Sequence, residues 1–165
     1  MPGDSLNATP ETTRKLLWSV GVTAIAGLSL FAFLAWRSVT IERADPSDAL
    51  RRFAQVESRL RSSEPLLHID AGGTITRRPA PVGEPARLSR LQALAYRVPE
   101  QRLVHAVVPF WFLKLKGPAV QYALRDTGLD LKRLGVTPAD LEQYGAGIVL
   151  NETRPDGDRL LVWTE

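Results

Sequence analysis

The chain has 165 residues, of which 21 are Lys or Arg and 18 are Asp or Glu, and its formal net charge is +3. It contains no cysteine, which excludes disulfides, thiolate metal sites and cysteine nucleophiles. Residues 1–13 are polar and hold two prolines and a glycine, so we expect a disordered N-terminal tail there.

An uncharged segment runs from Leu16 to Trp36, with Lys15 before it and Arg37 after it. As a helix it spans roughly 31 Å, close to the thickness of a bilayer hydrocarbon core. Trp18 and Trp36 lie near its ends, where indole rings prefer the headgroup boundary. We predict a transmembrane signal anchor over 14–37 that is not cleaved, because small residues are missing at the cleavage positions. A buried core helix and a cleaved signal peptide are the alternatives.

Two further properties of the anchor follow from its residues. The adjacent Arg14 and Lys15 favour a cytoplasmic N-terminus and a periplasmic or extracellular C-terminal domain. More cations follow the anchor than precede it, which leaves the reverse orientation open. Small residues at four-residue spacing form a seam on which a second transmembrane helix could pack, namely Ser19, Thr23 and Gly27.

The remainder divides into a juxtamembrane linker, 38–44, and a single domain, 45–165, of about 120 residues, enough for one core. Asp45 and Pro46 predict the start of a helix that runs to about Ser62, with an apolar stripe at 4-3-4 spacing. The glycines after Asp70 predict a tight hairpin between short strands at 66–70 and 74–77. Strands are expected at 91–98 and at 103–116, the second of them interrupted by Pro109.

The C-terminal third predicts a short helix over 118–126 that ends at Gly128, and a helix that starts at Thr137 and stops near Gly145. Two strands, 147–152 and 159–164, flank the turn signal 154–158. Antiparallel hairpins combined with two to four short helices indicate an α+β domain behind one transmembrane helix.

Charge is unevenly distributed along the domain. Residues 77–116 carry an excess of Arg and Lys, whereas residues 117–165 carry an excess of acids. One interpretation is a basic β region that contacts anionic headgroups or an acidic partner. The other is that these cations neutralise the acidic C-terminal third.

Few residues suggest catalysis or metal binding. His68 and Asp70 lie on one face of a strand and could orient an imidazole, but no third partner accompanies them. His105 lies within an apolar run and is expected to be a half-buried strand residue. We therefore predict no catalytic residue, no cofactor and no metal site, and an enzyme using His68 and Asp70 is kept as an alternative.

The segment from Asp70 to Thr74 resembles the D-x-G-G-T phosphate turn of the actin-like and sugar-kinase superfamily, through Asp70, Gly72, Gly73 and Thr74. The resemblance covers only those positions, and about 120 residues cannot supply the two large ATPase lobes of that superfamily. Amides of Gly72 and Gly73, with Arg77 and Arg78 nearby, remain a candidate anion site.

Three consecutive aromatic residues form the strongest interaction candidate. On a strand, Phe110 and Phe112 would share one face and Trp111 the other. The candidate patch comprises Phe110, Trp111, Phe112, Lys114 and Lys116, facing either a membrane or a partner. The alternative is that both faces are covered within the domain.

Together these features predict a membrane-anchored, non-catalytic binding or scaffold domain, an accessory subunit of a membrane protein assembly. Its partners would be the lipid bilayer and another membrane protein or a second copy, reached through the anchor or the basic β region. Nucleic acid is not expected as a partner. The rival functions are a sensor of a small anionic ligand near the Gly72-Gly73 turn and the enzyme described above.

Overall fold

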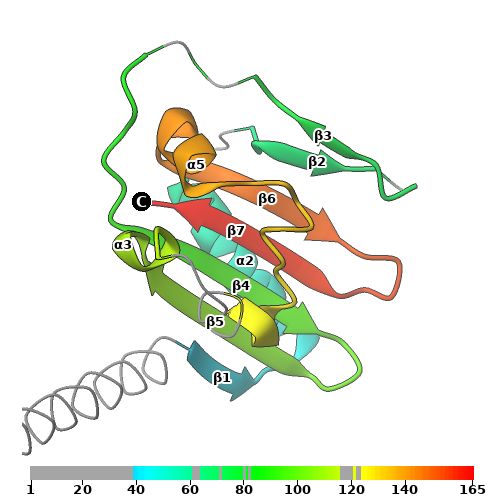
Figure 1. Cartoon of the computed structure of the whole chain (residues 1–165). Coiled ribbons are helices and arrows are strands. Elements are labelled where there is room, and N and C mark those ends of the chain that lie inside the picture. The colour runs from blue at the N-terminus through cyan, green and yellow to red at the C-terminus, as the bar shows by residue number, and fades with distance from the viewer. Residues whose placement is uncertain are drawn as a thin grey trace, which may run out of the picture. The chain divides into compact units, whose positions relative to one another are not determined.

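The computed structural model describes residues 39–60, 64–70, 72–79, 81, 83–115, 121 and 124–165. These residues form a seven-stranded sheet in the order β1-β5-β4-β7-β6-β2-β3 (Figure 1). The strands are β1 (Val39–Arg43), β2 (Leu67–Ile69), β3 (Ile75–Arg77), β4 (Arg90–Arg97), β5 (Arg102–Pro109), β6 (Gly147–Thr153) and β7 (Arg159–Thr164). The helices of this part of the chain are α2 (Pro46–Arg59), α3 (Phe110–Leu113), α5 (Pro138–Tyr144) and the short 3₁₀ helix η1 (Arg125–Thr127). The predicted α+β class is confirmed.

The sheet is mixed, whereas the sequence predicts antiparallel hairpins alone. The hairpins β2–β3, β4–β5 and β6–β7 are antiparallel as expected. Strand β2, however, runs parallel to β6 through the pair Leu67 and Leu150. This pairing joins segments about 80 residues apart, which no local pattern in the sequence could indicate.

The sheet begins earlier than predicted. Residues 39–43, expected to be part of a linker, form edge strand β1, which pairs antiparallel with β5. Val39 and Ile41 alternate with polar residues, but the pattern covers only five residues, most of them exposed, and it was not recognised as a strand.

Helix α2 covers one face of the sheet. Pro46 occupies its first turn as predicted, but the side chain of Asp45 makes no capping hydrogen bond. Asp48 in the first turn instead pairs with Arg51. The predicted stripe is confirmed at Ala49 and Phe53, which are buried. They pack in one cluster with sheet residues Leu94, Tyr96, Leu103, Ile148, Leu161 and Trp163.

The opposite face of the sheet is covered by the segment that runs from η1 to α5 (Figure 1). Its buried side chains include Leu124, Leu129 and Val136. The sheet residues that alternate with the α2-facing ones are small or aliphatic and also buried, among them Ala93, Ala95, Ala106, Leu160 and Val162. A strand with both faces covered is largely apolar, which explains why five of the six consecutive buried residues of β4 are apolar, Gln92 being the exception.

The predicted strand over 103–116 ends at Pro109 and continues as the four-residue helix α3. Pro109 is the N-cap of α3. The helical geometry buries Phe110, Phe112 and Leu113 together, so the alternation of faces expected for a strand does not apply here.

The predictions for 137–164 are confirmed. Thr137 and Asp140 form a capping box at the start of α5, and Gly145 ends the helix. Gly128 adopts a left-handed conformation after η1, with φ 72°. Arg154 N–H donates to Asp158 O at 2.8 Å across the β6–β7 turn.

No helix among the described residues is long and apolar enough to cross a membrane. The predicted anchor over 14–37, with its seam at Ser19, Thr23 and Gly27, lies outside those residues, as does the tail 1–13.

Candidate functional site

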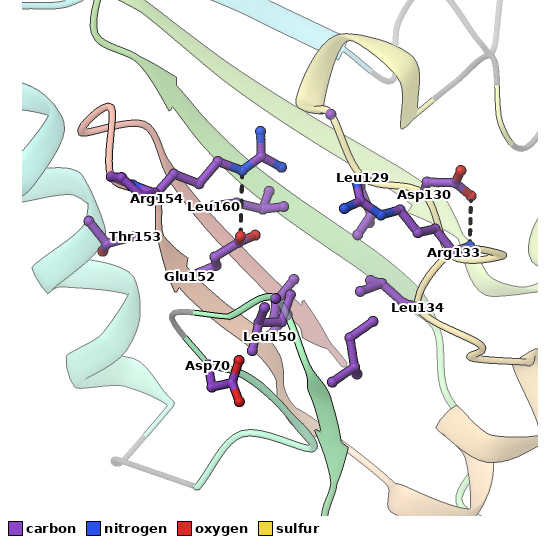
Figure 2. A pocket seen from close by; sticks show the side chains of 15 residues that line it. Asp70, Leu129, Asp130, Arg133, Leu134, Leu150, Glu152, Thr153, Arg154 and Leu160 are labelled. Carbon is purple, nitrogen blue, oxygen red and sulfur yellow. Dashed lines mark hydrogen bonds and ion pairs between the residues drawn. The ribbon is translucent and has the colours of Figure 1, made fainter.

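A cavity of about 510 Å³ opens on the face of the sheet opposite α2 (Figure 2). Three segments form its walls: the β2–β3 hairpin, the loop over 128–134 and the β6–β7 hairpin. The hairpin β2–β3 is tied to β6 near Leu67 and diverges from it toward the hairpin tip (Figure 1). The cavity occupies the space that this divergence leaves, and its volume is in the range of small-molecule sites.

The cavity combines an aliphatic lining with charged groups at its mouth. Six aliphatic side chains line it: Ile69, Ile75, Leu129, Leu134, Leu150 and Leu160. Five charged side chains also line it: Asp70, Asp130, Arg133, Glu152 and Arg154. An aliphatic lining with a few converging polar groups is typical of sites that bind amphipathic small molecules.

The two arginines of the cavity differ in how their charge is compensated. Arg154 Nε lies 3.5 Å from Glu152 Oε1, and the Arg154 side chain is 32% exposed. Arg133 donates its backbone N–H to Asp130 Oδ1 at 3.2 Å. Within the described part of the chain, no acceptor or acid pairs with the Arg133 guanidinium.

Asp70 lies at the other side of this cavity and stabilises the hairpin turn. Its Oδ1 accepts hydrogen bonds from the N–H groups of Thr74, at 2.8 Å, and Gly72, at 2.9 Å. These bonds, that of Thr74 foremost, lower the pKa of Asp70 below its ordinary value. The amide of Gly72 is thus already occupied by a carboxylate, and Asp70 would repel an anion at the turn.

The arginines predicted to assist that turn point elsewhere. Arg77 pairs with Asp140 at 3.1 Å and also donates to Gly135 O. Arg78 pairs with Glu64 at 3.4 Å and lies over the Tyr144 ring. Neither arginine lines the cavity, so the structure does not bring Arg77 and Arg78 together with Gly72 and Gly73 around one site.

His68 and Asp70 do not form a pair that could work as a catalytic dyad. His68 is exposed, and it does not line the cavity beside the β2–β3 hairpin or the cavities of about 420 and 400 Å³ near α2. The Asp70 oxygen that accepts hydrogen bonds does so from the turn amides. Within the described ranges, no group of three or more His, Cys, Asp or Glu residues is placed to hold a metal ion.

His105 lies in a second cavity, of about 420 Å³, between α2, β1 and the sheet. It is half-buried, as predicted, and stacks on Trp163 with ring centroids 5.9 Å apart. His105 Nε2 lies 3.1 Å from Gln92 Oε1. Burial, followed by the charge of Arg52, lowers the pKa of His105, which favours the neutral imidazole. The ring is thus held by stacking and by one side-chain hydrogen bond.

The predicted aromatic patch is only partly on the surface. Phe110 and Phe112 are 2% and 8% exposed, whereas Trp111 is 56% exposed. Lys114 pairs with Glu142 at 2.6 Å and lies over the Phe110 ring. Lys116 lies outside the described residues. Trp111 therefore remains as the surface aromatic of the predicted patch, with Leu115 exposed close by in the sequence.

Most cations of the basic region 77–116 are paired with acids. The ion pairs are Arg77–Asp140, Arg78–Glu64, Arg90–Glu165, Arg97–Asp158, Arg102–Glu100 and Lys114–Glu142. Four of these acids belong to the acidic C-terminal third. This arrangement fits the interpretation that the two regions neutralise each other, and it weakens the case for a free basic surface.

Edge strand β1 is a second candidate site, for a protein partner. Ala44 N–H donates to Gln101 O at 3.0 Å, and β1 pairs with β5 in antiparallel register. Backbone groups alternate sides along such a ladder, so Thr40 and Glu42 turn theirs toward β5. Val39, Ile41 and Arg43 then turn theirs outward, where none of the described strands pairs with them.

The sequence did not indicate either candidate site. Arg133 lies in a loop, Arg154 begins a turn, and the aliphatic lining comes from segments that span positions 69 to 160. No regular spacing in the sequence links these residues to one another. For β1, the alternation of Val39 and Ile41 with polar residues was the available signal. Comparisons of the chain with protein-family models, with curated proteins and with solved structures found no match.

Proposed function

We propose that this chain is a membrane-anchored, non-catalytic binding domain that serves as an accessory subunit of a membrane protein assembly. The observation that carries the proposal is the outer edge of β1, with which no strand of the described residues pairs. An edge strand offers unpaired N–H and C=O groups to an incoming strand, and this pairing is a common mode of protein recognition.

The side chains of β1 support the same role. Ile41 is 49% exposed, and the residues after Val39 are all exposed. Edge strands that must stay unpaired are commonly protected by proline, by charged side chains, by a bulge or by a covering element, and of these β1 has the charges of Glu42 and Arg43. Strand β1 has no proline, and its register with β5 is regular over five pairs. A strand from a partner membrane protein is the occupant that we favour.

The predicted anchor lies just before β1 in the sequence. Val39 follows Trp36, the last residue of the uncharged segment, by three positions. An anchor over 14–37 would therefore keep β1 close, along the chain, to the membrane in which a partner resides. The favoured orientation has the N-terminus in the cytoplasm and the domain on the periplasmic or extracellular side.

Replacement of Ile41 by proline tests the role of the β1 edge. Because the Ile41 N–H faces outward, Ile41→Pro removes a donor that a partner strand would use and leaves the bonds to β5 in place. We expect the full-length protein, solubilised mildly from its membrane, to lose a stoichiometric partner with this variant while the domain stays folded. Size-exclusion chromatography with light scattering measures the loss.

Two matched pairs of variants control this experiment. Thr40→Pro removes a bond to β5 and should destabilise the domain itself. Ile41→Lys protects the edge by charge, whereas Leu50→Lys changes a similarly exposed residue, 57% exposed, on α2. A partner that is retained by Ile41→Pro and Ile41→Lys, or a wild-type chain that elutes as a clean monomer, would contradict the proposal.

A further inference from the structure

The charged side chains of the cavity beside the β2–β3 hairpin are unevenly distributed, with arginines on one side and Asp70 on the other. Figure 2 shows Arg133 extending from its loop over the cavity on the side where Arg154 lies, while Asp70 lies at the opposite side. Asp130 turns to the outer side of the loop, where its carboxylate accepts N–H bonds from Lys132 and Arg133. One side of the cavity therefore presents two guanidinium groups with the Glu152 carboxylate beside Arg154, and Leu150 lies between that side and Asp70.

On the cationic side of the cavity, the backbone at Gly128 lies close to two arginines. Gly128 adopts φ +72°, and a Cβ built there would lie 2.6 Å from Arg97 Nη2 and 4.0 Å from Arg154 Nη1. Arg97 is compensated by Asp158 at 3.1 Å. Arg154 is compensated through its Nε by Glu152, which leaves its terminal nitrogens without an acid among the described residues. The Arg133 side chain extends over the cavity toward this same side (Figure 2).

We propose that this cavity binds an amphipathic anion, an aliphatic chain that ends in a single carboxylate or phosphate group. The anionic end lies between Arg133 and Arg154, because a guanidinium forms strong, directional hydrogen bonds with both groups. The chain lies on Leu134, Ile69 and Ile75, the half-buried aliphatic residues of the lining, which lose apolar surface to it. Asp70 at the far side disfavours the reverse orientation.

This site does not involve the β1 edge. It also differs from the anion site predicted from the sequence, which lies at the Gly72-Gly73 turn. The Gly72 amide is occupied by Asp70, so the anion is held by side chains from 128–134 and from the β6–β7 turn instead. Two sources can supply such a ligand: a free acyl carboxylate and a lipid-derived alkyl phosphate. Both share the chemistry that the cavity recognises.

Calorimetric titration of the full-length protein in phosphatidylcholine nanodiscs tests the proposal, with octanoate and octyl phosphate as probes. We expect saturable binding of at least one probe and a loss of about tenfold or more in affinity with Arg133→Ala. Arg133→Lys should retain part of the affinity. Lys132→Ala, which removes a charge from the same loop at a side chain outside the cavity lining, should change it little.

The remaining measurements separate the contribution of the anionic group from that of the aliphatic chain, and they identify the source of the ligand. Octanol and inorganic phosphate should each bind far more weakly than the probe that joins both features, and Leu134→Gln should weaken binding of either probe. The tighter of the two probes identifies the source. Absence of binding by both probes, equal binding of octanol, or equal losses for Arg133→Ala and Lys132→Ala would overturn the proposal.

Discussion

Replacement of Phe53 by alanine is expected to lower the free energy of unfolding by about 4 kcal/mol. Phe53 is 1% exposed and joins α2 to the sheet cluster around Leu94 and Leu161. Arg159 lies over its ring, 4.6 Å from the centroid, and pairs with Glu57 one turn further along α2 at 2.6 Å. Truncation would leave a cavity beneath the helix and remove the ring on which Arg159 rests.

Urea unfolding of the full-length protein in nanodiscs, followed by hydrogen exchange in β4 and β7, measures this loss. Leu50→Ala is the matched control, since Leu50 is on the same helix and 57% exposed, and its effect should stay within about 0.5 kcal/mol. Since domains of this size are typically stable by about 5–15 kcal/mol, the Phe53 variant should lose between roughly a quarter and four fifths of its free energy of unfolding. Equal effects of the two substitutions would show that α2 does not pack as described.

The second large effect is expected at Asp158, where Asp158→Ala should lower the free energy of unfolding by about 3 kcal/mol. Its side chain is 9% exposed and pairs with Arg97 at 3.1 Å. Its other oxygen accepts the Val98 N–H at 2.9 Å, so one carboxylate ties the β6–β7 turn to the end of β4. Without it, a part-buried guanidinium and an amide lose their acceptor together.

Asp158→Asn should cost less than Asp158→Ala, because an amide oxygen can still accept from Val98 while the ion pair is lost. Glu100→Ala is the control: Glu100 pairs with Arg102 at 3.6 Å in the neighbouring turn but is 58% exposed. Its loss should stay within about 0.5 kcal/mol in the same unfolding experiment. If Asp158→Ala costs no more than Glu100→Ala, the carboxylate does not join the two turns.

The sequence predicted the elements that depend on local signals. Thr137, Pro138 and Asp140 mark the start of α5 because their capping bonds close within one helical turn. The 154–158 turn was likewise predicted from its own residues. Elements that depend on distant partners were missed: β1 pairs with β5 across about 60 residues, and β2 pairs with β6 across about 80.

The difference between local signals and distant partners also explains why the aromatic segment was expected to be a strand but forms a helix. A strand was expected because the residues after Leu103 are strongly apolar, and Pro109 suggested only an interruption. Residues 110–113 instead form a helix, which places Phe110, Phe112 and Leu113 in the core. A short apolar run does not distinguish a buried strand from a buried helix, so the position of its partners decides.

Site-specific photocrosslinking in the native membrane tests most directly whether the domain works by binding through β1. With a benzophenone amino acid at position 43, whose backbone faces outward, we predict a discrete adduct that disappears in the Ile41→Pro background. The crosslinked peptide should come from a strand of a membrane protein, and an adduct of twice the chain's mass would identify a second copy. The same reagent at position 50 should give no such adduct. Adducts that persist in the Ile41→Pro background, or that form equally from position 50, would contradict the account.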